Sequence, residues 1–190
     1  HTKLSDWAVE AESKESKVSL TSDGSIDIIA PKGLTLWYKR QMQGNVIIEY
    51  DAQIVVEEHN NNTWNRLSDL NCFWQATDPK QKDGSVLRGI PKRKGIFANQ
   101  YALSLYYMGY GGNYNSTTRF RRYNGNENGV KDPSFRPAIL REYTDPGHIL
   151  KPNHWYHIRL EQHFGHVRYI IDGECIVDYL DIRPFYRGFF

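Results

Sequence analysis

Cysteine is scarce in this sequence, and long apolar runs are absent. Only Cys72 and Cys175 occur, far apart and flanked by apolar residues, which favours buried free thiols over a disulfide. Neither has the neighbours of a nucleophile or a metal ligand. No apolar run approaches the roughly 20 residues that span a bilayer, and no hydrophobic signal-peptide segment opens the chain. No membrane partner is therefore expected.

Excess charge of one sign is also missing. The net charge of +2, with acids interspersed among the basic residues, is too mild for a nucleic-acid-binding protein. The pairs His154-x-x-His157 and His163-x-x-His166 would project to opposite faces of a strand, so no metal site is predicted. No cofactor is expected, and a structural calcium ion is left open.

Helical periodicity is the third absence, since no segment longer than about two turns shows it. Short alternating runs occur instead, such as Asn45–Val56, and Asp172-Gly173 joins two of them as a strong hairpin signal. This pattern predicts an all-β fold, a two-sheet antiparallel β-sandwich of the jelly-roll kind, in a single domain over residues 1–190. The residues predicted to lie between the sheets are Val46, Ile48, Tyr50, Leu103, Leu105, Phe120, Ile158 and Leu160.

Two segments precede the middle of the chain. Leu67–Gln75 alternates as a strand that places Asn71 and Gln75 on one face. Thr77–Asn99 is rich in proline, glycine and basic residues, including Arg93, and is predicted to be a loop or lid whose cations attract a polyanion. A solvated loop is the alternative.

The stretch Tyr101–Asn124 is the most distinctive, with six tyrosines, three arginines and no acid. Its two strand-like runs are joined by a Gly- and Asn-rich turn. Alternation predicts one mixed face that carries Tyr106 and Tyr110 before the turn and Arg119 and Arg121 after it. Flat rings stack on sugars and guanidinium groups grip carboxylates, so this face predicts a site for an acidic carbohydrate. An ordinary solvated hairpin is the alternative.

Four longer segments are distinctive as well: GLTLWYKRQMQGNVIIEYDAQIV, SDLNCFWQATDP, LYYMGYGGNYNSTTRFRRYNG and YHIRLEQHFGHVRYIIDGECIVDY. With them the chain resembles the YesU-like family of concanavalin-type β-sandwich proteins from bacterial systems that degrade pectin and related acidic polysaccharides. The resemblance implies a concanavalin-like jelly roll with a sugar-binding cleft on its concave face, and a secreted or periplasmic location. Family members usually continue past a Gly-Phe-Phe segment, so a longer homologue is expected to carry a further strand.

The first functional hypothesis is a polysaccharide lyase that cleaves a pectin- or rhamnogalacturonan-type glycan by β-elimination. This reaction needs a cation to neutralise the uronate carboxylate and a group to move the α-proton. Arg119 and Arg121 are predicted to be the neutralising pair, and Tyr106 the catalytic proton-transfer residue, with Tyr110 or Tyr123 as alternatives. The residues predicted to bind substrate are Asn71, Gln75, Tyr110, Asn113 and Tyr123. The expected partner is an acidic polysaccharide, met by a monomer or dimer.

Two alternatives stay open. A non-catalytic carbohydrate-binding module would use the same cleft. A glycoside hydrolase would use Glu49 and Asp51, which have the spacing of sandwich glycosidases, but the third position is Gln53, whose amide is no general acid. An exterior charged strand face also explains this trio.

Overall fold

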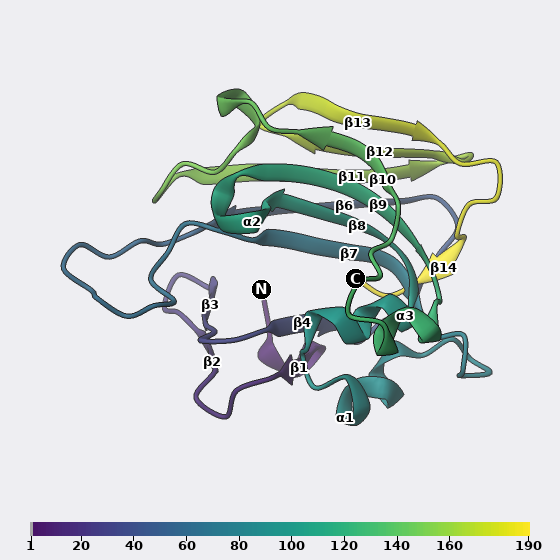
Figure 1. The fold of residues 1–190 in the computed structure, drawn as a ribbon, viewed down its shortest axis with the longest axis horizontal. Coiled ribbons are helices and arrows are strands. Elements are labelled where there is room, and N and C mark those ends of the chain that lie inside the picture. Colours follow the sequence, from purple (N-terminus) through teal and green to yellow (C-terminus); the bar gives the residue numbers. More distant parts are fainter. Residues whose placement is uncertain (1) are drawn as a thin grey trace.

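The computed structural model describes residues 2–190 as two four-stranded antiparallel sheets stacked face to face (Figure 1). This arrangement confirms the predicted all-β antiparallel sandwich. The first sheet has the order β10-β9-β8-β7, with bounds β7 Leu70–Thr77, β8 Ser104–Gly111, β9 Thr117–Asn124 and β10 Ile139–Tyr143. The second has the order β13-β12-β11-β6, with bounds β6 Val46–Gln53, β11 Trp155–His163, β12 His166–Ile171 and β13 Glu174–Leu180.

Smaller elements surround the two sheets. Three strand pairs lie outside them: β1 (Trp7–Ala11) with β4 (Leu34–Tyr38), β2 (Lys17–Leu20) with β3 (Ile26–Ile29), and β5 (Met42–Gln43) with β14 (Arg187–Gly188). The α-helical turns are α1 (Ile90–Arg93), α2 (Gly112–Asn115) and α3 (Glu127–Lys131), and the 3-10 turns are η1 (Leu4–Asp6), η2 (Val86–Gly89), η3 (Phe97–Ala102) and η4 (Pro146–His148). Within residues 2–190, no helix is long and apolar enough to cross a membrane.

The main core lies between the two sheets. Because side chains alternate along a strand, every second residue of each sheet points into this layer. Its fully buried members include Trp74, Tyr106, Met108 and Phe120 from the first sheet and Ile158, Leu160, Val167 and Tyr169 from the second. Ile48 and Tyr50 pack against them, so the predicted core positions in β6, β9 and β11 are confirmed, while Val46 at the start of β6 is half-buried.

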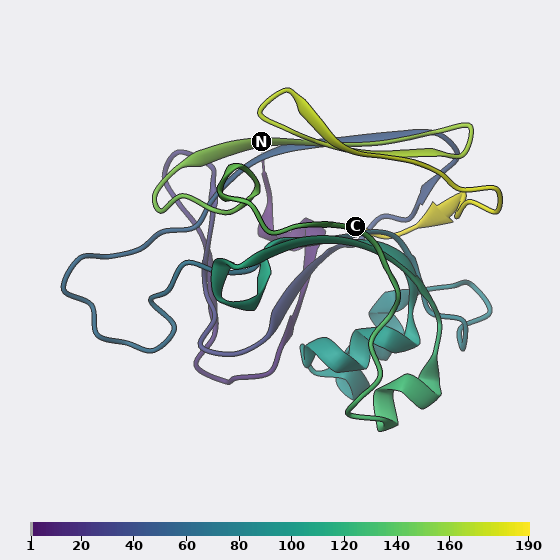
Figure 2. The same cartoon turned by 45° about the horizontal axis from the view of Figure 1, so that its top comes forward.

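Leu103 and Leu105 correct the prediction, because they lie in a second core on the outer face of the first sheet. There they join Phe73, Tyr123 and Trp37, under the layer formed by β1, β4, α1 and α3 (Figures 1 and 2). Strand β8 is buried on both faces, since Tyr106 and Met108 fill the inner one. Alternation alone therefore could not tell which face of β8 meets the second sheet.

The segment Thr77–Asn99 forms the short turns η2 and α1, and one of its predicted lid cations, Arg93, is buried. Arg93 is 5% exposed and its Nη2 donates to Glu10 Oε2 at 2.7 Å and to the Val86 carbonyl at 2.7 Å. Glu10, in β1, also accepts from Trp37 Nε1 at 2.9 Å. Arg93 therefore links α1 to β1 and is not available to bind a polyanion.

Both cysteines are free, as predicted, but only Cys72 is buried. Its burial in the main core raises the pKa of the thiol to about 12. Cys175, in β13, is exposed and its thiol donates to the Val177 carbonyl at 3.2 Å. The apolar flanks of Cys175 therefore misled the prediction of its burial.

Candidate functional site

The outer face of the first sheet changes character along its strands. Near η3 it is apolar and covered by the second core. Beyond Phe73, the strand register brings polar side chains onto the same face. One row across the sheet runs from Asn71 in β7 through Gly109 in β8 and Arg119 in β9 to Glu142 in β10. In the neighbouring row, Tyr107 lies opposite Arg121. We call these residues the outer polar strip: Asn71, Tyr107, Arg119, Arg121 and Glu142. It crosses all four strands of the sheet.

Tyr107 shapes the middle of the outer polar strip. Its hydroxyl donates to Asn71 Oδ1 at 3.2 Å, and its ring leans over Gly109, where a Cβ atom would lie 2.1 Å from the Tyr107 hydroxyl. Burial raises the pKa of Tyr107 above its ordinary value. The phenol is therefore protonated at neutral pH and acts as a hydrogen-bond donor, not as a base.

We expect Gly109→Ala to disturb this arrangement. The added methyl group displaces the Tyr107 ring and breaks its bond to Asn71, at a cost of about 1–3 kcal/mol in the free energy of unfolding, although alanine is ordinarily the better strand residue. Urea denaturation measures the change. Gly147→Ala, at an exposed turn, is the matched control and should change stability little. Equal stability of the two variants would contradict the close packing.

Arg121 is the most unusual member of the outer polar strip. It is only 8% exposed, and its Nη1 donates to the Pro137 carbonyl. Within residues 2–190 no carboxylate lies at ion-pair distance from it, whereas Arg93, the other buried arginine, has Glu10. A guanidinium withdrawn from water without a counter-ion is costly. Among residues 2–190, therefore, no carboxylate neutralises the charge of Arg121.

Arg119 was expected to be a second cation without an acidic partner, but it forms an ion pair. Its Nε donates to Glu142 Oε1 at 2.6 Å, and Glu142 comes from β10, 23 residues further along the chain. Asp69, which directly precedes β7, pairs with Arg66 at 3.3 Å and not with Arg119. The Nη groups of Arg119 make no other hydrogen bond among the described residues and remain available as donors.

Tyr106 does not share a face with Arg119 and Arg121, so that part of the prediction is wrong. The register pairs Tyr106 with Arg122 and Tyr107 with Arg121. Tyr106 is fully buried in the main core and donates to Asp181 Oδ2 at 2.8 Å, and burial together with this bond raises its pKa. The length of the turn decides which residues of the two strands lie opposite each other in a hairpin. The prediction placed this pairing one residue away from the observed register.

Tyr110 is also remote from the arginines. It faces the end of the main core beside Tyr156, with ring centroids 5.6 Å apart. Both rings border a hollow of about 120 Å³ that is rimmed by His148, His154 and Asp172. Burial raises the pKa of Tyr110.

The remaining predicted substrate-binding residues divide by exposure. Gln75 is fully buried at a strand irregularity with φ of 50°, and Tyr123 is 1% exposed in the second core, so neither is accessible to a ligand. Asn113 is exposed on the turn and its Nδ2 donates to Thr117 Oγ1 at 3.1 Å. Asn71 alone among the five lies in the outer polar strip.

The residues of the hydrolase alternative, Glu49, Asp51 and Gln53 of β6, lie on the other side of the molecule, on the outer face of the second sheet. Arg159 donates to Glu49 at 2.7 Å, and this bond lowers the pKa of Glu49. A carboxyl group that stays ionised is a poor general acid. Gln53 donates to the Asn153 carbonyl at 2.7 Å. The arrangement favours an exterior charged face over a hydrolase site.

We expect His157 on that face to titrate above the ordinary histidine range. Its hydrogen bond to Asp51, 2.9 Å away, raises its pKa, and Glu49 adds to this effect. A raised pKa means that the stabilisation is present below the unfolded-state pKa and is lost as pH rises through the folded value. NMR titration of the ring tests the direction. The melting-temperature difference between parent and His157→Gln should shrink over this range, and a difference that stays constant would contradict the raised pKa.

Sequence reasoning missed Tyr107 and Glu142. The only sequence signal for Tyr107 was the alternation that places it on the same strand face as Leu105. Nothing in the sequence indicated Glu142, because it lies near Arg119 only through the pairing of β10 with β9. Within the described residues, no three His, Cys, Asp or Glu side chains gather closely enough to hold a metal ion.

Comparisons with known proteins agree with this fold. No curated protein matches the sequence. A Bacillus subtilis protein of unknown function with a galectin-like fold is similar at a TM-score of 0.67 and 16% identity, over 98% of this chain and 81% of that one. The carbohydrate binding module CBM66 from Bacillus subtilis is similar at a TM-score of 0.52 and 13% identity, over 97% and 84%.

These structural matches show the galectin-like sandwich fold alone, and they do not confirm the resemblance to the YesU-like family. A family model described as "Domain of unknown function (DUF6250)" matches residues 28–190. This match spans most of the chain, from within β3 to beyond the C-terminal strand β14. The chain belongs to the DUF6250 family.

Proposed function

We propose that this protein binds an acidic carbohydrate on the outer polar strip without cleaving it. The observation that carries the proposal is Arg121, a buried guanidinium of the outer polar strip with no carboxylate partner among residues 2–190. Its planar fork matches the carboxylate of a uronic acid. The similarity to the carbohydrate binding module CBM66 supports the same class of ligand.

The neighbouring side chains suit a sugar acid. The Asn71 amide and the free Nη groups of Arg119 supply further hydrogen-bond donors beside Arg121. Phe97 of η3 is 39% exposed, and its ring lies 5.5 Å from that of Tyr107, which offers an aromatic surface at the border of the outer polar strip. Aromatic surface next to charged and amide donors is the combination that a uronate ring requires.

Lyase chemistry receives less support from the same residues. β-Elimination needs a proton acceptor close to the neutralising cation. Tyr106 is buried on the wrong face, and the pKa of Tyr107 is raised, so neither phenol is prepared to act as a base. Binding without bond cleavage is therefore the function we propose, together with a secreted or periplasmic location, where polymeric glycans are met.

A polysaccharide panel tests this proposal. Affinity electrophoresis should show retardation by polygalacturonate and rhamnogalacturonan and none by neutral galactan, with retardation reduced by salt because the contact is ionic. The ultraviolet absorbance of unsaturated uronates should stay flat during long incubation. A rise in that absorbance would identify a lyase. Equal retardation by neutral galactan would contradict the proposal that Arg121 binds the carboxylate of the glycan.

A further inference from the structure

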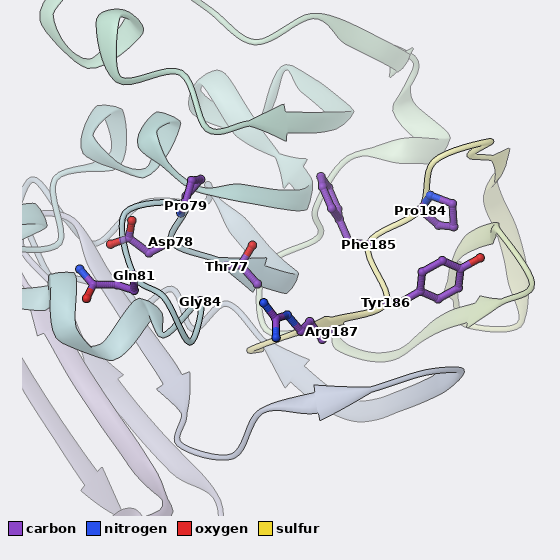
Figure 3. Close-up of a pocket in the computed structure, with 9 residues that line it drawn as sticks. All are labelled: Thr77, Asp78, Pro79, Gln81, Gly84, Pro184, Phe185, Tyr186 and Arg187. Carbon is purple, nitrogen blue, oxygen red and sulfur yellow. The ribbon is translucent and has the colours of Figure 1, made fainter.

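A second hollow, of about 470 Å³, lies between the turn Thr77–Gly84 and the C-terminal segment Pro184–Arg187 (Figure 3). Its volume falls in the range of small-molecule sites. Thr77 ends β7, six residues after Asn71, so the hollow is about 20 Å along the strand from that end of the outer polar strip. It is a separate place on the molecule.

The walls of this hollow are fixed by contacts from outside it. The Phe185 amide donates to the Tyr106 hydroxyl at 3.3 Å, and the Phe185 ring lies 4.0 Å from Cζ of Arg122. The Tyr186 carbonyl accepts from the Gly44 amide at 2.7 Å. The opposite turn is closed by the Asp78 amide, which donates to the Gly84 carbonyl at 3.0 Å. A hollow held in this way loses little conformational entropy when a ligand enters.

Polar side chains around the hollow lack internal partners. The side chains of Thr77, Gln81 and Arg187 make no hydrogen bond or ion pair with any residue from 2 to 190, and Arg187 is exposed. Figure 3 shows the Arg187 side chain pointing toward Thr77. Asp78 does not neutralise Arg187, because it accepts from the Lys80 amide at 2.9 Å and lies 4.0 Å from Arg93.

The remaining wall is apolar and flat. The rings of Pro79 and Phe185 lie on opposite sides of the hollow in Figure 3. One flat aromatic ring, a free guanidinium, a hydroxyl and an amide around a space of this size are what a single sugar ring with a carboxylate needs, since its apolar face stacks and its carboxylate takes a guanidinium fork. We propose that this hollow binds one acidic sugar residue, with its carboxylate on Arg187, independently of the outer polar strip.

NMR titration with D-galacturonate tests this site, with D-galactose as the neutral comparison. The backbone amide of Gly84 reports on the hollow, and that of Gly109 reports on the outer polar strip. Galacturonate should shift the Gly84 amide saturably, and galactose should need about tenfold higher concentration. Arg187→Gln should weaken galacturonate binding at Gly84 about tenfold, because a charge-assisted pair is lost. Gln81→Ala should weaken it less.

Arg183→Gln is the matched control, because Arg183 is an exposed arginine next to the same segment, and its side chain makes no hydrogen bond or ion pair among the described residues. It should bind like the parent. A Gly84 amide that does not move, or that responds equally to galactose or in Arg187→Gln, would overturn the proposal. Movement of Gly109 without Gly84 would overturn it and leave the function of the outer polar strip standing.

Discussion

Arg93→Met should lower the free energy of unfolding by about 3–5 kcal/mol, because it leaves a buried carboxylate without its cation. Glu10 is fully buried and would keep only its neutral donors, Trp37 Nε1 at 2.9 Å, Gln100 Nε2 at 3.0 Å and the Gly95 amide at 3.1 Å. The methionine fills much of the volume of the arginine stem. The loss therefore reports on charge more than on packing.

Urea denaturation gives the change in unfolding free energy. Arg88→Met is the matched control in the same segment, since Arg88 is exposed and pairs with Asp83 at 2.7 Å; it should cost less than about 1 kcal/mol. Similar losses in the two variants would show that the Arg93–Glu10 pair is not a buried link. Glu10 precedes residue 28, where the family match begins, so this pair would also show that β1 stabilises the matched region.

The sequence predicted those parts of the fold that depend on one strand at a time. Alternation in β6 and β11 placed Ile48, Ile158 and Leu160 in the main core correctly, because the opposite faces of these strands carry charged residues. Strand β8 is apolar on both faces, so the same rule could not choose between Leu105 and Tyr106 for the layer between the sheets. Because the two faces of β8 were exchanged in the prediction, Tyr106 was wrongly assigned to the candidate site.

The candidate site was predictable only in part for a second reason, since its partners come from distant strands. The absence of acids near Arg119 in sequence suggested free charge, but β10 brings Glu142 to it. The same absence was informative for Arg121, whose neighbour across the β9–β10 pairing is Ile139. The prediction that Gln75 binds substrate failed because Gln75 lies in a bulge with a positive φ. Glutamine rarely adopts this conformation, and no local sequence pattern indicates it.

Arg121→Lys tests whether Arg121 holds the acidic group of the ligand, with the dissociation constant of a galacturonate oligosaccharide measured by calorimetry. Lysine keeps the charge but not the planar fork, so we expect affinity to fall by about tenfold or more. Arg141→Lys is the matched control, because Arg141 lies exposed on β10 opposite Phe120 rather than on the face of Arg121.

Thermal melting of both variants shows whether each remains folded at the temperature of the titration. We expect Arg121→Lys to stay folded and lose affinity while Arg141→Lys binds like the parent. Parent-like affinity in Arg121→Lys, or a loss that only follows its unfolded fraction, would contradict the claim that Arg121 holds the acidic group of the ligand.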